Sequence, residues 1–382
     1  MNTLKLMVLG AVAALSGLTA CESSNSPTTG TTGSGGSSST TSTTTTTGSG
    51  TGGGADVCGG YETVTAMDNA SCKHSATDFD PKNTANDGWA ACKSDDGIFH
   101  PFDVNVGSDK RTVAFDAIGK LLGFGTIAKP DAQAFIDAKV LYVEPEGIES
   151  RVVRREDWHY PEAPKACNMM TPDEQAMYKD RCVGPQKLMP VINQAFTDGA
   201  KGIEPTANAI KLEAALLWMF YISAFAESNS CFEDLGDCDS ASGYYSGSRS
   251  PDEPHGLASY IKARSPQAHQ YVWDGLLAIQ CWRDQDAAIP PAKPELQDQA
   301  KKQFDRALLR GMALIFRQKV ENIDCPEAAI GAKFIGELLD RESRARDAAK
   351  ADVIKAELAK SDITTIDKKA ITDAVDALYD CP

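Results

Sequence analysis

The chain has little of what catalytic and nucleic-acid-binding sites commonly require. Among its 382 residues are only 5 histidines, and it contains no P-loop, no H-E-x-x-H and no G-x-S-x-G motif, so no site of those kinds is indicated. Basic residues are also few: 38 lysines and arginines stand against 53 acidic residues, which gives a net charge of −15. This charge argues against nucleic acid and anionic lipid as partners, because both attract basic surfaces. Whether the protein is an enzyme stays open.

Two further patterns are missing. The apolar run 214–226, in which Ser223 is the one clearly polar residue, is shorter than the roughly twenty residues needed to cross a bilayer. No two cysteines have the spacing C-x-x-C, which argues against a thiolate zinc site. These absences direct attention to the termini, the cysteines and the few histidines.

The N-terminus has the layout of a secretory signal peptide over residues 1–20, since Lys5 precedes the short apolar run 6–18. This run is followed by L-T-A-C, ending at Cys21, which resembles the lipobox of bacterial lipoproteins. The resemblance implies cleavage before Cys21, acylation of its sulfur and its amine, and attachment to a lipid bilayer. Glu22 follows, where the inner-membrane retention signal of enteric bacteria has aspartate, so the resemblance implies the outer membrane, facing the periplasm or the cell surface. The alternative is an ordinary signal peptide.

Composition divides the rest of the chain into three parts. Residues 21–54 are nearly all Ser, Thr and Gly, which predicts a flexible tether that reaches about 30 Å from the lipid. Residues 55–110 are rich in Gly, Asp and Asn and predict an irregular cap held by disulfides. Residues 111–382 carry apolar residues at helical spacing and predict a mostly α, disulfide-stabilised helical bundle. Similar A-L-L helix beginnings at 215–217 and 307–309 leave two packed halves open.

Cysteine, in contrast, is plentiful. Of 11 cysteines, those other than Cys21 form an even-numbered set, which predicts disulfides in an oxidising compartment. Spacing favours Cys231 with Cys238, Cys167 with Cys182, and one pair among Cys58, Cys72 and Cys92. The remaining cysteines would then take long-range partners.

Local patterns predict several elements. The apolar run predicts a central helix from about 206 to 227, covered by neighbours on most sides. The capping box that begins at Thr171 predicts a helix start. Residues 139–143 are the best strand candidate, and residues 243–253, which include two tyrosines, predict an exposed excursion.

One group of side chains suggests a metal site. A neutral imidazole and two carboxylates can bind a transition metal, and Glu156, His159 and Glu162 supply them if a turn brings the three together. The H-x-x-E element that begins at His159 is similar to that of imelysin-like periplasmic lipoproteins, a helical family associated with iron or haem uptake; Asp157 stands where that family has glycine. The alternative is a surface cluster of the aromatic residues 158–160, anchored by ion pairs to nearby arginines.

A second group is acidic. Glu233, Asp234, Asp237 and Asp239 lie close together in the sequence, and such hard oxygen ligands suit calcium. The spacing departs from an EF-hand, because Ser242 stands where that loop requires glycine. The alternative is a solvated acidic turn.

The sequence therefore favours an outer-membrane-anchored extracytoplasmic lipoprotein that binds a ligand. The ligand would be a small molecule, a divalent or iron ion, or a metal complex. Two alternatives remain: a metal-dependent hydrolase, and a module that engages an envelope partner without metal.

Overall fold

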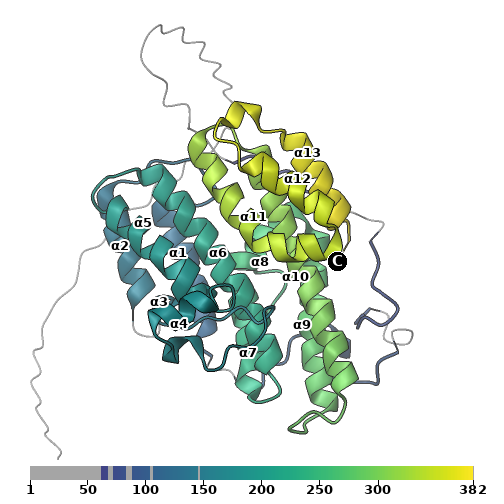
Figure 1. Cartoon of the computed structure of the whole chain (residues 1–382). Helices are drawn as coiled ribbons and strands as arrows, with labels where there is room; N and C mark the ends of the chain where they lie inside the picture. Colours follow the sequence, from purple (N-terminus) through teal and green to yellow (C-terminus); the bar gives the residue numbers. More distant parts are fainter. Residues whose placement is uncertain (1–61, 68–71, 83–87, 104–105, 145–146, 382) are drawn as a thin grey trace, which may run out of the picture. The chain divides into compact units, whose positions relative to one another are not determined.

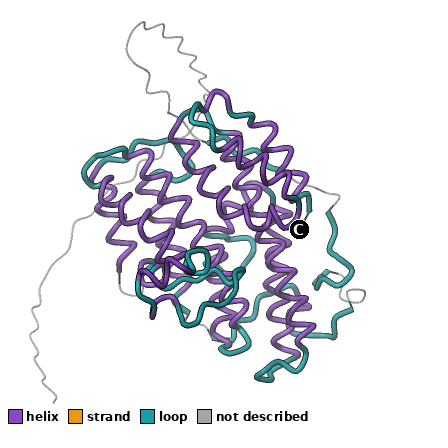
Figure 2. The backbone as a smooth tube through the Cα atoms, in the orientation of Figure 1, coloured by secondary structure: helices purple, strands orange, loops and turns teal. Residues whose placement is uncertain are grey.

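The computed structural model describes residues 62–67, 72–82, 88–103, 106–144 and 147–381. The expected signal peptide, the lipidated Cys21, the tether and Cys58 lie outside these residues. From Glu62 onwards, the described residues belong to one compact unit. They contain thirteen α-helices and no strand (Figures 1 and 2), so the predicted mostly α, disulfide-stabilised fold is confirmed.

The helices follow one another closely from residue 108 to the C-terminus. They are α1 (Ser108–Leu122), α2 (Ala132–Val143), α3 (Glu149–Val152), α4 (Pro172–Met177), α5 (Met189–Gly199), α6 (Pro205–Ser230), α7 (Leu235–Ser246), α8 (Gly256–Arg264), α9 (Pro266–Gln285), α10 (Pro294–Glu321), α11 (Pro326–Arg346), α12 (Ala348–Leu358) and α13 (Lys368–Leu378). Four short 3-10 or π-helical turns are η1 (Lys93–Asp96), η2 (Cys167–Met169), η3 (Gly184–Leu188) and η4 (Ile363–Thr365). Of the expected cap 55–110, the described part holds η1 and the first residues of α1.

Helix α6 is the centre of the fold, as the apolar run predicts. Its neighbours include α5, α7, α8, α10 and α11 (Figure 1). Pro205 stands at its first turn, where the missing proline N–H costs no helical hydrogen bond. Because no polar stripe interrupts the middle of the helix, neighbours can cover it on every side.

Length and composition would also allow α6 to cross a membrane. It has 26 residues, and 94% of its most apolar stretch is buried inside the protein. A helix that other helices bury in this way is typical of a protein core.

Two local predictions are wrong. Residues 139–143 are helical and form the second half of α2, because Asp131 caps that helix and Phe135, Ala138 and Tyr142 recur at helical spacing on its buried side. Of the excursion expected at 243–253, residues 243–247 are not exposed, whereas residues 252 and 253 are. Tyr244 and Tyr245 lie in α7 and are almost fully buried, since α7 packs its C-terminal half against α6 and α1.

The capping box at Thr171 is present and begins α4: the Thr171 side chain accepts from the Glu174 N–H, and the Glu174 carboxylate accepts from the Thr171 N–H. The same device begins other helices. Ser265 caps α9 by accepting from Ala268 N–H, and Pro266 follows at the first helical position. Such caps satisfy backbone donors that have no partner within the helix.

Disulfides tie distant parts of the unit together. Cys231 pairs with Cys238 and Cys167 with Cys182, as their spacing favours. Cys72 and Cys92 do not pair with each other: Cys72 is joined to Cys381 and Cys92 to Cys281. Cys325 is disulfide-bonded as well. Sequence spacing could not predict these two long-range pairs, because only the folded chain brings their Cα atoms close together. The Cα–Cα distance is 5.5 Å for Cys72 and Cys381 and 5.4 Å for Cys92 and Cys281.

A buried ion network joins the irregular N-terminal segment to the bundle. Lys319 of α10 lies 2.9 Å from Glu213 of α6 and 3.1 Å from Glu62, and its side chain is 1% exposed. Burial by itself lowers the pKa of Lys319, but the two carboxylates outweigh it and raise the pKa. Tyr260 also donates to Glu213, so the charges are compensated as buried ions require.

Candidate functional site

The segment 156–182, between α3 and η3, is a small folded module. The disulfide between Cys167 and Cys182 closes it. Inside the loop, Arg181 Nε donates to Glu156 Oε2 at 2.8 Å, and its Nη1 donates to the Tyr160 carbonyl at 3.0 Å. Glu156 also accepts from the Cys167 N–H at 2.8 Å. These bonds fix the backbone of residues 156–160 and thereby the direction of the side chains on it.

His159 points from this module into the bundle. Its Nδ1 lies 2.6 Å from Asp157 Oδ1, and its Nε2 lies 3.0 Å from Asp305 Oδ1 on α10. The imidazole is 5% exposed. Each ring nitrogen therefore faces its own carboxylate, one from the loop and one from a helix 146 residues away in the sequence.

Two aromatic rings of α6 lie parallel to the imidazole. Its centroid is 3.8 Å from that of Phe225, with 9° between the planes, and 5.6 Å from that of Tyr221, with 8° between the planes. The Tyr221 hydroxyl lies 3.2 Å from Nε2 and donates to Asp305 at 3.4 Å. Tyr221 and Phe225 are one helical turn apart, so a single face of α6 receives the ring.

His159 is positively charged at neutral pH. Burial alone would lower its pKa, but Asp305 and Asp157 outweigh that effect and raise the pKa to about 9. An imidazolium has no free nitrogen lone pair for a metal ion. Its stacking on Phe225 places the charge over an aromatic face, which is favourable.

The metal triad expected from the sequence does not converge. The Glu156 carboxylate is held by Arg181 and the Cys167 N–H, and Glu162 is exposed. Among the residues that the structure describes, the side chains at mutual metal-ligand distance are Cys92, Asp95 and Cys281, and the two cysteines are joined to each other. The expected surface cluster differs as well: Trp158 is exposed beside Arg181, but His159 is buried.

The four acidic residues around Cys238 also point in different directions. Asp234 caps α7 by accepting from Gly236 N–H, and Glu233 is exposed. Asp239 is buried and accepts from the Asp103 N–H. Burial and the neighbouring Glu227 carboxylate raise the pKa of Asp237 to about 7. Asp234 and Asp239 thus bind backbone N–H groups, and the four carboxylates are not among the described side chains at mutual metal-ligand distance.

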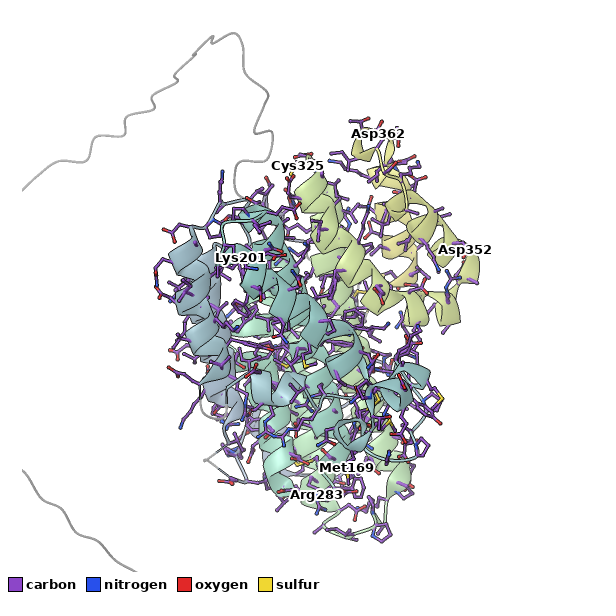
Figure 3. The ribbon with its side chains drawn as sticks, turned by 60° about the vertical axis from the view of Figure 1, so that its left-hand side comes forward. Met169, Lys201, Arg283, Cys325, Asp352 and Asp362 are labelled. Atoms are coloured by element: carbon purple, nitrogen blue, oxygen red, sulfur yellow. A yellow bond between two sulfur atoms is a disulfide. The ribbon has the colours of Figure 1, made fainter. Side chains whose placement is uncertain are left out.

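A cavity lies next to the His159 module. It has a volume of about 640 Å³ and is lined by α11, α12 and α13, by Phe316 of α10, and by Tyr160, Lys179, Asp180 and Lys187. We call it the α11–α13 cleft. Its size falls within the roughly 300–1,000 Å³ typical of small-molecule sites. In Figure 3, the labelled Asp352 marks α12, one wall of this cleft.

The inner wall of the cleft is apolar, with one polar pair. The apolar side chains are Phe316, Leu339, Ile354, Leu358 and Val375, all buried. Ser343 Oγ and the Tyr379 hydroxyl also line the cleft and lie 3.0 Å apart. Burial raises the pKa of Tyr379 to about 12, so its hydroxyl keeps its proton at neutral pH.

Gly336 of α11 shapes this inner wall. A Cβ at this position would lie 2.9 Å from Leu358 Cδ1 and 3.1 Å from Phe316 Cε2. The glycine therefore allows α10, α11 and α12 to approach closely behind the cleft.

The module and the cleft are physically continuous. Tyr160 follows His159 in the chain and lines the cleft, and the Arg341 guanidinium of α11 lies 5.9 Å from the centre of its ring. Consequently the Arg181 bond to the Tyr160 carbonyl, which fixes the backbone beside His159, also positions one residue of the cleft lining.

The sequence patterns missed the residues that matter most at this place. Asp305 and Tyr221 lie far from His159 in the chain, and Tyr221 is hidden inside an apolar helix whose residues look alike. The one signal in the sequence was the spacing of Tyr221 and Phe225, because residues four apart lie on the same face of a helix.

Compared with known proteins, the chain matches no family model, no curated protein and no solved structure.

Proposed function

We propose that the protein is an outer-membrane-anchored extracytoplasmic lipoprotein that binds a small ligand in the α11–α13 cleft. The cleft carries this proposal: it offers about 640 Å³ of space lined by buried apolar side chains and by polar and charged groups. The L-T-A-C sequence ending at Cys21 supports the lipid anchor. Four disulfides between described cysteines support an oxidising compartment.

An organic ligand fits this geometry better than a bare metal ion. Glu156 and His159 are engaged with protein partners, and the described residues contain no cluster of three free metal ligands. For the same reason, no described group of side chains supports the alternative function of a metal-dependent hydrolase.

Membrane attachment is tested with Cys21→Ser. We expect the wild-type protein in the membrane fraction and this variant in the soluble fraction, because the variant lacks the acceptor thiol. Continued sedimentation of Cys21→Ser with membranes would contradict the anchor.

Ligand binding is tested by filling the cleft. Ala359 lines it, whereas Ala356, also exposed and also near the end of α12, does not. A panel of neutral, cationic and anionic fragments is screened by thermal shift on the wild type, on Ala359→Trp and on Ala356→Trp. We expect fragments whose shift is lost in Ala359→Trp and kept in Ala356→Trp. If every fragment shifted the melting temperature of Ala359→Trp as much as that of the wild type, the proposed site would be overturned.

A further inference from the structure

The α11–α13 cleft is positively charged in a strongly acidic protein. Five basic residues line it against three acidic ones, although the chain as a whole carries a net charge of −15. A local excess of one sign inside a partly enclosed space focuses the potential and attracts ligands of the other sign.

The acidic residues of the lining are already neutralised by close partners. Lys187 Nζ lies 2.9 Å from Asp180 and 2.8 Å from Glu337, and Lys179 Nζ lies 3.3 Å from Asp180, so two ammonium groups face these two carboxylates. Asp340 is bound by Arg344, which is not part of the lining, at 2.9 Å. These pairs leave little negative charge to repel an anion.

Two ammonium groups of the lining remain available. Lys333 of α11 and Lys355 of α12 are exposed, and neither side chain makes an ion pair or hydrogen bond with any described residue. They belong to the two helices that form opposite arms of a hairpin joined at Asp347. Arg341, also in the lining, adds a third cation, which pairs with Glu342 outside the lining at 3.5 Å.

The apolar wall determines the rest of the ligand. Phe316, Leu339 and Leu358 are shielded from bulk water but border the cleft, so they would gain contacts with a hydrocarbon body. A fully ionic ligand such as a bare inorganic anion would leave this wall unused.

From this combination, which rests on the proposed function, we infer that the cleft takes an amphipathic organic anion. Its apolar body lies along the wall of α10, α11 and α12, and its anionic head meets Lys333 and Lys355. The chemistry resembles that of a medium-chain carboxylate.

The test uses three probes that share a ten-carbon chain: decanoate, decanol and decylammonium, each kept below its aggregation concentration. Their dissociation constants are measured by calorimetry on the full-length wild type and on Lys333→Glu, Lys355→Glu and Lys201→Glu. Lys201 is exposed, lies away from the cleft lining and is labelled in Figure 3. Its variant makes the same change in net charge.

We expect decanoate to bind most tightly and decylammonium most weakly. Lys333→Glu and Lys355→Glu should each raise the dissociation constant of decanoate by roughly tenfold, as expected for reversing one nearby, partly screened charge. In these two variants the dissociation constant of decanol should change by less than about twofold. Lys201→Glu should leave the dissociation constants of all three probes unchanged. Ala359→Trp should weaken every probe.

Other outcomes separate the two proposals. Equal affinity for the three probes, all lost in Ala359→Trp, would overturn the anion inference and leave the ligand cleft standing. Equal weakening of decanoate by Lys201→Glu would also overturn the inference, because the effect would then be one of net charge. If the probes bound Ala359→Trp as tightly as the wild type, or if no probe bound at all, both the anion inference and the proposed ligand cleft would be overturned.

Discussion

His159 is a buried positive charge that fastens the module 156–182 to the bundle. Asp157 belongs to the module itself and Asp305 to α10, so the imidazolium joins the module to the bundle, in addition to the contacts of Asp180 with Lys187 and of Tyr160 with Arg341. The two stacked rings of α6 exclude water from it. Buried ion pairs are sensitive to loss of one partner, because the remaining charges are left uncompensated.

We predict that this arrangement weakens at alkaline pH. The folded pKa of about 9 lies above the ordinary value of 6.5, so the stabilisation is complete below about pH 6.5 and is lost as pH rises through 9. The full shift corresponds to on the order of 3 kcal/mol. Urea unfolding of the wild type and His159→Gln should show a difference of that order at pH 6 that shrinks toward pH 9.

His255→Gln is the matched control. His255 pairs with Asp116 at 2.8 Å, but its side chain is 44% exposed, and exposed pairs contribute about 0–1 kcal/mol. A difference between wild type and His159→Gln that stays constant from pH 6 to pH 9 would show that the imidazole is not held as a cation.

At the scale of elements, the pair α9 and α10 depends on a glycine. A Cβ at Gly275 of α9 would lie 2.7 Å from Phe304 Cα and 3.1 Å from Phe304 N on α10. Those are backbone atoms of a long helix and cannot turn aside, so the closest approach of the two helices requires the absence of a side chain.

We predict that Gly275→Ala destabilises the protein by roughly 1–3 kcal/mol through overpacking, even though alanine favours a helix by about 1 kcal/mol. Thermal unfolding measures the change. Gly236→Ala in the first turn of α7 is the control, because its new methyl group meets only the Asp234 side chain, at 3.2 Å. If Gly275→Ala were as stable as the wild type, the close approach of α9 and α10 would be contradicted.

The helix pattern itself was largely readable at this scale. The central helix was expected at about 206–227 and is α6, Pro205–Ser230; the helix start at Thr171 is α4. The strand prediction at 139–143 was wrong because a window of five residues, three of them β-branched or aromatic, is too short to reveal the helical spacing that begins at Phe135. The burial of Tyr244 and Tyr245 depends on α1, which no local pattern near them indicates.

At the scale of the whole molecule, disulfides close the chain on itself. The bridge between Cys72 and Cys381 spans 309 residues and that between Cys92 and Cys281 spans 189, whereas the bridge between Cys167 and Cys182 spans 15. A bridge that closes a longer loop removes more conformational freedom from the unfolded chain.

We therefore predict that the double change of Cys72 and Cys381 to serine costs about 2–5 kcal/mol of unfolding free energy, and more than the same change at Cys167 and Cys182. Urea unfolding under non-reducing conditions makes the comparison. The second double variant is the matched control, since it also removes one bridge. A larger loss from the short bridge would show that local packing, rather than chain closure, sets the contribution.

The sequence by itself determined the class of the molecule: a helical, disulfide-bonded unit built around one apolar helix. Those properties follow from composition, from the period of the apolar residues and from caps, all of which act over a few residues. The two shortest disulfides belong to the same class of local information.

Only the tertiary structure decided which side chains meet. His159 was recognised as a candidate metal ligand. In the folded chain it is surrounded by Asp157, Asp305 and α6, and it forms a buried ion pair that joins the module to the bundle. The α11–α13 cleft joins Tyr160 to helices some 170–220 residues further along the chain. Distances between such residues depend on how helices pack, and packing is a property of the whole chain rather than of any window within it.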